Sequence, residues 1–238
     1  MANRGETKSQ KSLSVANLRI IRRKENKWTV KSMTGAHTKE SSVPISFILR
    51  DLLKLAKTMK EAKGMLNEGL VKVNGKVRKS YRHPVGLFDV VDLEKIGMRL
   101  RVVLDSKGRI ATKEISAKEK MVKINKIAGK MVVKGGLIQL AANDGSTFLE
   151  KKTDINVGDS VLVELPGGKV GKRIEMKEGN LAYIIGGKHS GTVGKIKSII
   201  EGGMNKDMLL TLEGDRGDFQ TVEKNVLIVG EKKTEIEI

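Results

Sequence analysis

From residue 71 onward, short β-branched segments alternate with turns that contain glycine, and this pattern restricts the fold more than any other feature of the chain. Valines alternate with basic residues on both sides of Asn74-Gly75, a dipeptide typical of two-residue hairpin turns. A second hairpin is predicted over 99–115, with its turn at 105–108. Short, regularly spaced strands with such turns indicate a small barrel or sandwich.

The same texture continues over the rest of the chain. Further strands are predicted at 87–93, 121–127, 130–133, 137–141, 160–165, 181–185, 192–200, 207–213 and 225–229. The residues after them, 231–238, are expected to form a frayed tail. The chain shows no convincing internal repeat.

Two short helices are predicted upstream, within 43–69. Apolar residues at helical spacing follow Pro44, which suits the first turn of a helix. Thr58 is predicted to cap the second helix, with Glu61 as its capping-box partner, and Gly69 to end it. We therefore expect an α+β protein that is mostly β.

Charge is concentrated in the first half of the chain. Residues 1–107 hold 24 Lys and Arg against 10 Asp and Glu, a net charge of +14, whereas residues 108–176 carry +5 and residues 177–238 carry −1. Such a field favours a polyanionic partner, and nucleic acid is the commonest one. The alternative is a solvated basic surface without a partner, but +14 exceeds what solubility alone requires.

Composition argues against several other classes. There is no cysteine, and the three histidines fit no zinc spacing, so we expect no metal and no cofactor. Neither a catalytic triad nor a Walker A loop is present, so we expect no enzyme activity and no small-molecule substrate. No signal peptide and no apolar stretch of about 20 residues is found, so no membrane association is expected. Aromatic residues make up only 3%, so RNA recognition would rest on phosphates and shape.

Residues 1–42 have the composition of a basic arm that is disordered alone and orders against RNA. Trp28 is its only large anchor. The alternative is a flexible tail without a role. Its candidate RNA-binding residues are Arg19, Arg22, Arg23, Lys24 and Lys27.

The stretch 50–91 resembles the helix–helix–hairpin RNA-binding module known as the S-four domain. The resemblance is carried by Arg50-Asp51-Leu52-Leu53, by the basic second helix and by the hairpin around Asn74-Gly75. In that family, an arginine of the first helix and basic residues of the second helix and hairpin contact RNA phosphates. The matching positions here are Arg50, Lys60, Lys63, Lys76 and Arg78, and Lys79 and Arg82 extend the same surface by proximity.

The stretch 179–196 resembles a KOW motif, which occurs in SH3-like barrels of ribosomal proteins and transcription elongation factors. Gly191 matches the key glycine of that motif, where a turn needs a positive φ or a close backbone approach. The resemblance implies that Lys188, His189 and Lys195 face RNA.

The order of these parts, end to end, resembles the S-four-e family of small-subunit ribosomal proteins from archaea and eukaryotes. The resemblance implies small-subunit rRNA and neighbouring ribosomal proteins as partners, a structural role in translation and subunit assembly, and a cytoplasmic location in the small subunit. The expected parts are a basic arm (1–42), an S-four-like domain (43–107), a central β domain (108–176) and a KOW SH3-like barrel with a tail (177–238). The alternative is a non-ribosomal RNA-associated factor with a KOW barrel, acting in transcription elongation or ribosome assembly.

Overall fold

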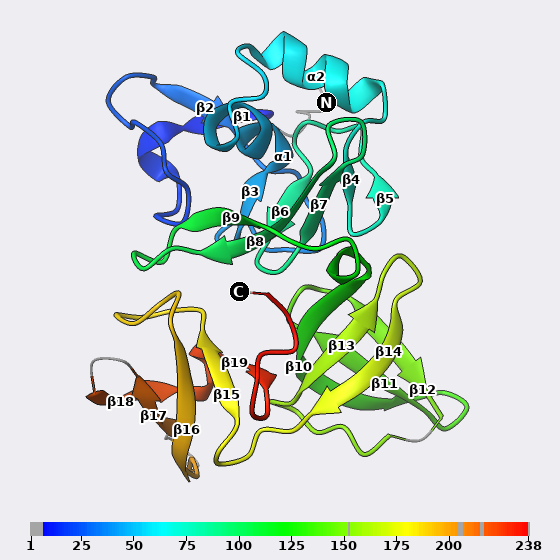
Figure 1. Ribbon diagram of the computed structural model, residues 1–238, viewed down its shortest axis with the longest axis vertical. Coiled ribbons are helices and arrows are strands. Elements are labelled where there is room, and N and C mark those ends of the chain that lie inside the picture. The colour runs from blue at the N-terminus through cyan, green and yellow to red at the C-terminus, as the bar shows by residue number, and fades with distance from the viewer. Residues whose placement is uncertain (1–6, 152, 204–206, 215–216, 238) are drawn as a thin grey trace, which may run out of the picture.

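The structure, a computed structural model, describes residues 7–151, 153–203, 207–214 and 217–237. Residues 1–6 of the predicted arm and residue 238 of the predicted tail lie outside these ranges. Within them, the strands form three five-stranded antiparallel sheets and two two-stranded ones. Figure 1 shows the first large sheet and the helices at one end of the molecule, with the other two large sheets beside each other at the opposite end. The expectation of a mostly β, α+β protein is confirmed.

The first sheet contains both predicted hairpins, the one around Asn74-Gly75 and the one over 99–115. In order across the sheet, its strands are β5 (Lys76–Val77), β4 (Lys72–Val73), β7 (Val90–Leu93), β8 (Met98–Leu104) and β9 (Ile110–Glu114). Asn74 and Gly75 have φ angles of 52° and 75°, as a type I′ turn requires. The expected boundary between 107 and 108 falls in the β8–β9 turn, so this sheet extends beyond it to Glu114.

The first helix is shorter than the predicted helical segment and starts differently. Pro44 lies in β3 (Ser42–Pro44), which pairs with β6 (Pro84–Gly86), so it precedes the helix instead of occupying its first turn. The helix begins as α1 (Ile45–Phe47) and continues as a π-helix over Ile48–Leu52. Its apolar side chains are buried against the first sheet.

The second helix, α2 (Met59–Asn67), forms as its local sequence predicts. The Thr58 hydroxyl accepts a hydrogen bond from the Glu61 amide, and the Glu61 carboxylate accepts one from the Thr58 amide. Gly69 follows the helix with a φ of +73°, the left-handed conformation typical of a residue just past a helix end. The capping box and the terminal glycine are therefore confirmed.

The N-terminal segment is folded, so the expectation of an arm without structure of its own is wrong for its described part. Strands β1 (Ser9–Lys11) and β2 (Trp28–Val30) pair in an antiparallel hairpin, which we call the N-terminal hairpin. The Arg82 guanidinium donates to the Lys31 carbonyl at 3.0 Å, and the Met33 amide donates to the Arg82 carbonyl at 2.9 Å. These bonds fix the end of the hairpin to the segment that leads into β6.

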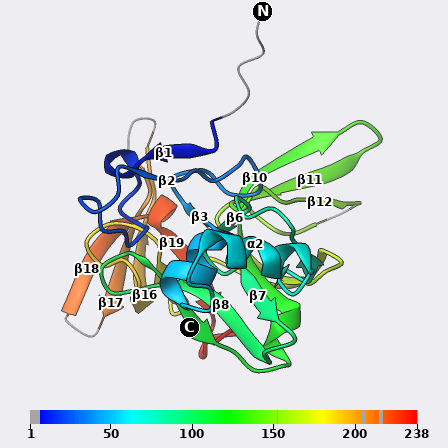
Figure 2. The same ribbon diagram turned by 90° about the horizontal axis from the view of Figure 1, so that it is seen from above.

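The central sheet differs from the prediction in three strands. Its strands in order are β12 (Thr147–Glu150), β11 (Leu137–Ala142), β10 (Val122–Val133), β13 (Ser160–Glu164) and β14 (Lys169–Ile174). The two strands predicted at 121–127 and 130–133 are one strand, β10, with an irregularity between Ile127 and Gly129. Strands β12 and β14 were not predicted. Figure 2 shows the hairpin of β10 and β11 extending beyond the body of the molecule.

The C-terminal sheet also contains one unpredicted strand, β18. Its strands in order are β18 (Gly217–Val222), β17 (Leu209–Gly214), β16 (Val193–Ile200), β15 (Leu181–Ile184) and β19 (Val226–Gly230). The predicted frayed tail is wrong, because Ile236 is buried in the main core.

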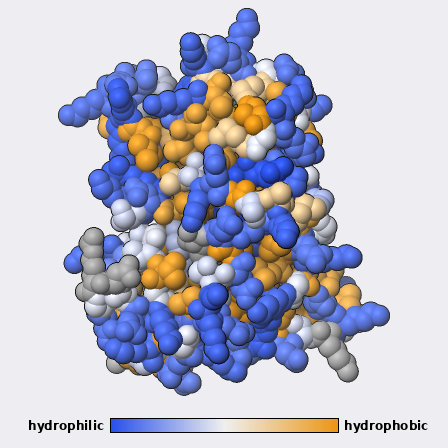
Figure 3. Space-filling view, viewed as in Figure 1, coloured by the Kyte–Doolittle hydropathy of each residue, from blue (hydrophilic) through white to orange (hydrophobic). Residues whose placement is uncertain are grey.

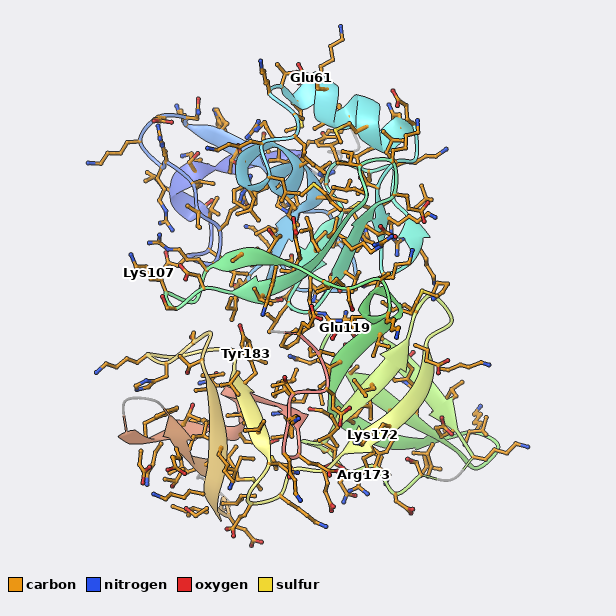
Figure 4. The ribbon with its side chains drawn as sticks, viewed as in Figure 1. Glu61, Lys107, Glu119, Lys172, Arg173 and Tyr183 are labelled. Atoms are coloured by element: carbon orange, nitrogen blue, oxygen red, sulfur yellow. The ribbon has the colours of Figure 1, made fainter. Side chains whose placement is uncertain are left out.

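Buried Arg101 of β8 holds the C-terminal segment in place. Its guanidinium donates to the Glu119 carboxylate at 2.7 Å and to the Glu237 carbonyl at 3.3 Å. Figure 4 shows Glu119 where the first sheet meets the other two large sheets.

One apolar core joins the first sheet and the C-terminal sheet. The Phe88 and Tyr183 rings pack with their centroids 5.2 Å apart. The Tyr183 hydroxyl donates to the Leu104 carbonyl and accepts from the Leu104 amide at 2.9 Å. Burial raises the pKa of Tyr183 to about 12. The central sheet has a separate, smaller apolar cluster.

A buried ionic network joins the first sheet to the central sheet. The Lys123 ammonium donates to the Asp89 carboxylate at 2.6 Å and to the Asp144 carboxylate at 2.7 Å. Asp89 also accepts from His37 at 2.9 Å and from the Asn74 side chain at 2.8 Å. Burial alone would raise the pKa values of both carboxyl groups, but Lys123 lowers both, and His37 assists at Asp89. In the folded protein, Asp89 and Asp144 are therefore both ionised and share the Lys123 charge.

Candidate nucleic-acid interface

A groove of about 860 Å³ separates the N-terminal hairpin from the two helices. One wall consists of β1, β2 and the loop between them, and the other of the π-helix, the start of α2 and Tyr81. We call it the hairpin–helix groove. Its basic lining residues are Lys8, Arg22, Arg50, Lys54 and Lys63, and its acidic ones are Glu25 and Asp51.

The two acidic side chains of the groove are already paired. Arg50 binds the Asp51 carboxylate through two hydrogen bonds, of 2.9 and 2.8 Å, and Arg22 binds Glu25 at 2.7 Å. The hydrogen bonds that Arg50 donates to Asp51 raise the pKa of Arg50. The groove therefore presents a net positive lining to any ligand.

Three predicted RNA-binding residues, from three separate segments, meet in this groove. They are Arg22 from the segment expected to be an arm, Arg50 from the first helix and Lys63 from α2. The Lys63 ammonium lies 4.5 Å from the centre of the Tyr81 ring, which positions the charge, and the residue stays exposed. Sequence reasoning missed Lys8 and Lys54, because only the folded hairpin brings Lys8 to the helices and forms a groove in front of Lys54.

Arg19 does not reach this surface. Its side chain is buried, lies 4.7 Å from the centre of the Phe47 ring and donates to the Val30 carbonyl at 2.8 Å. Burial lowers its pKa to about 10, with Asp51 acting in the opposite direction. Arg19 therefore anchors the N-terminal hairpin to α1.

A second basic surface lies beside the β8–β9 turn. Arg23, Lys107 and Arg109 line a depression of about 420 Å³ there, and Figure 4 shows Lys107 at the tip of the turn. Arg23 donates to the Asn17 side chain at 2.7 Å, which orders the loop before it. Lys107 and Arg109 were not predicted as RNA-binding residues, since a turn position by itself gives no signal of contact.

The remaining predicted residues are spread over the surface. Lys24 and Lys27 are exposed in the loop before β2, and Lys60 is exposed on α2. Lys76 lies in β5, at the opposite edge of the first sheet from β9, with Arg78 and Lys79 just after it. Arg82 contacts the N-terminal hairpin through the bonds given above. The structure therefore does not gather all of these cations into one site.

The loop between β15 and β16 lies against the β8–β9 turn. Gly191 has a φ of +83°, and a Cβ added to it would lie 2.5 Å from the Asp105 carbonyl oxygen. Lys188 is exposed in this loop, and Lys195 is exposed on β16. The His189 ring stacks on Phe219 with centroids 4.1 Å apart. The loop thus extends the second basic surface onto the C-terminal sheet.

His83 gives the domain a pH dependence. Burial lowers the pKa of His83 to about 4, Arg78 and His37 act in the same direction, and Asp89 opposes them. Between pH 6.5 and 4, the unfolded chain binds a proton at this position that the folded chain does not, so stability decreases as the pH falls through this range. Since water still reaches part of the ring, we expect a loss of about 1–2 kcal/mol.

Urea unfolding of the protein and of His83→Gln at pH 7 and pH 4.5 measures this contribution. The variant is expected to show a smaller decrease in unfolding free energy between the two pH values. Equal decreases in both proteins would show that another group causes the pH dependence.

Within the described residues, no group of three or more His, Cys, Asp or Glu side chains is placed to hold a metal ion. The helices of the same residues are too short or too polar to cross a membrane.

The fold and the groove define the class of protein. Two helices packed on an antiparallel sheet, with a basic groove along them, form an RNA-binding type of domain, and residues 49–91 match the model of the S4 domain. This match covers the stretch 50–91 that resembles the S-four module. Residues 96–170, from the end of the first sheet through most of the central sheet, match the model described as Ribosomal family S4e.

Full-length relatives establish the family. The chain is 39% identical over 238 residues to "Small ribosomal subunit protein eS4" of Methanosphaera stadtmanae, covering 100% of this chain and 98% of that protein. It is 38% identical to the protein of the same name from Methanocaldococcus jannaschii, with 100% of both covered. The chain belongs to the ribosomal family S4e.

A solved structure agrees with this assignment. The crystal structure of the 30S ribosomal protein S4e from Thermoplasma acidophilum superimposes with a TM-score of 0.70 at 33% identity. The match covers 82% of this chain and 97% of that one. The likeness therefore includes most of the three-sheet arrangement.

Proposed function

We propose that this protein is a structural constituent of the small ribosomal subunit that binds rRNA. The observation that carries the proposal is end-to-end identity of 38–39% with proteins named as small ribosomal subunit protein eS4. The net positive groove on an S4 domain supplies a physical means of binding phosphates.

The proposal also covers the partners, the location, the absence of catalysis and the role of the C-terminal sheet. Neighbouring ribosomal proteins are the other partners, the location is the small subunit in the cytoplasm, and the protein catalyses no reaction. The C-terminal sheet, with Lys188, His189 and Lys195, acts as a further RNA-docking surface of the KOW type. The Gly191 geometry supports that reading, because the positive φ and the close backbone approach are what the motif requires of this glycine.

Sedimentation of cell lysate tests the proposal. Lysate is washed at high salt, separated on a sucrose gradient, and each fraction is analysed by quantitative mass spectrometry. We expect one copy per small subunit, retained after the wash. Release to the top of the gradient, or presence only on immature particles, would favour a transient RNA-associated factor.

Binding of the purified protein to its rRNA is expected to depend steeply on salt. If six to ten phosphates are contacted, the affinity should fall by a factor of about 10³–10⁵ between 50 and 200 mM salt. The dissociation constant, measured by filter binding at four salt concentrations, gives the slope. A change of less than tenfold would show that few phosphates are engaged.

A further inference from the structure

The hairpin–helix groove contains the only tryptophan of the chain. Trp28 lies in β2, opposite Lys11 in the register, and lines the groove together with the five basic residues. Trp28 is 55% exposed, so part of its indole is accessible to a ligand. We propose that this groove binds a short unpaired segment of RNA and that one of its bases stacks on the Trp28 indole. This inference rests on the proposed function and names the form of RNA that the groove accepts.

Charge supports an RNA backbone as the occupant. Arg22 and Arg50 neutralise the two acidic lining residues, so Lys8, Lys54 and Lys63 supply the net charge of the groove. Among the described residues, Lys8 and Lys54 have no ion-pair partner. Three lysines along one groove can follow successive phosphates of one strand.

The apolar part of the groove supports an unpaired base. Ile20, Ile21 and Met59 line it beside Trp28 and Tyr81. In Figure 3, apolar surface gathers over the upper part of the molecule and is surrounded by hydrophilic side chains. Aromatic faces next to cations are typical of single-strand binding, because every base has a face that can stack.

A duplex does not satisfy this arrangement. In an A-form helix the bases are stacked on each other, and their faces are closed to a side chain such as Trp28. The groove is also bounded on both sides, by the hairpin and by the helices. A loop, bulge or free end of a folded RNA offers both a backbone and an open base.

The strand that carries Trp28 is ordered before any RNA binds. Its strand pairs with β1, and Arg19 fastens the loop between these strands to Phe47 and to the Val30 carbonyl. Because the backbone that carries Trp28 is already ordered, binding has to order little more than the side chain itself.

Tryptophan fluorescence tests the inference directly, because Trp28 is the only source of the signal. The full-length protein is titrated at low salt with a single-stranded RNA hexamer and, separately, with a blunt RNA duplex of 12 base pairs. We expect the hexamer to quench and shift the emission at saturation. We expect the duplex to leave the emission nearly unchanged, even where it binds other basic surfaces.

Variants separate stacking from general attraction. By anisotropy of a labelled hexamer, Trp28→Ala is expected to bind about 5- to 150-fold more weakly, whereas Trp28→Phe keeps most of the affinity. Leu149→Ala, at another exposed apolar residue far along the chain in β12, serves as the matched control and is expected to bind normally.

Two results would overturn the inference. They are an emission unchanged by saturating hexamer, and equal hexamer affinities of Trp28→Ala and Leu149→Ala. The proposed function fails by a different observation, the loss of the protein from small subunits on the gradient. If the protein stays on the subunit but Trp28→Ala binds the hexamer normally, the ribosomal role stands and only the stacking site is refuted.

Discussion

Lys123→Ala is expected to lower the free energy of unfolding by about 3–5 kcal/mol, one of the two largest effects that the structure predicts. Lys123 is the only cation bonded to both Asp89 and Asp144 among the described residues, and its side chain is 3% exposed. Removing it leaves two carboxylates without their shared counter-charge, and Asp89 is fully buried. Urea unfolding at pH 7, followed by circular dichroism, measures the loss.

Two further variants show whether the loss comes from charge or from packing. Lys123→Met keeps the length and volume of the side chain, so it is expected to lose nearly as much as Lys123→Ala if charge is the cause. Lys134→Ala, at an exposed lysine in the turn after β10, is expected to change stability by less than about 0.5 kcal/mol. A Lys123→Met protein as stable as the unmodified one would show that this junction does not depend on its ion pairs.

The double variant Arg50→Glu with Lys63→Glu is expected to weaken rRNA binding by about 100-fold or more at 50 mM salt. Both residues lie in the hairpin–helix groove, and the change reverses two charges beside Asp51 and Glu25. Like charges then face the phosphates, and the salt dependence of binding becomes shallower. Filter binding with rRNA at 50, 100 and 200 mM salt measures both quantities.

A control with the same change in net charge makes the result specific. Lys134→Glu with Lys169→Glu places the reversals at two exposed positions of the central sheet. This control is expected to lose much less affinity than the groove variant, and both should show the circular dichroism of the unmodified protein. Equal losses in the two variants would mean that binding follows net charge alone and that the groove has no special part.

Local signals predicted the first domain well. The capping box of Thr58 and Glu61, the glycine at position 69 and the Asn74-Gly75 turn each depend on a few neighbouring residues, and all three form as expected. The resemblance to the S-four-e family, stated from motifs alone, agrees with the family that the relatives establish.

Long-range contacts explain most of the failures. Arg19 lies in a basic run that reads as solvent-exposed, and only the Phe47 ring and the Val30 carbonyl make burial favourable. Ile236 follows a charged stretch and is buried by other parts of the chain. Strand β14 was missed because its sequence, Lys169–Ile174, contains two lysines and a glycine among six residues, and both residue types have low strand propensity.

The candidate site could be predicted only in part for the same reason. The family resemblance identified Arg50 and Lys63, whose positions follow from a local motif. Lys8, Lys54 and the wall formed by Trp28 required the fold of the N-terminal hairpin against the helices. A sequence lists these residues far apart, and only the tertiary structure places them in one groove.

The core shared by the first and C-terminal sheets has a consequence for the protein during its own synthesis. Tyr183, whose hydroxyl binds both backbone groups of Leu104, lies 79 residues further along the chain. At about 5–20 residues per second, roughly 4–16 s pass between the synthesis of these two residues. Once Glu114 completes the first sheet, that sheet exposes the apolar surface that Tyr183 and its neighbours later cover, until those residues are made. During this period the exposed apolar surface makes the growing chain prone to aggregation. We expect a chaperone or an early RNA contact to protect it.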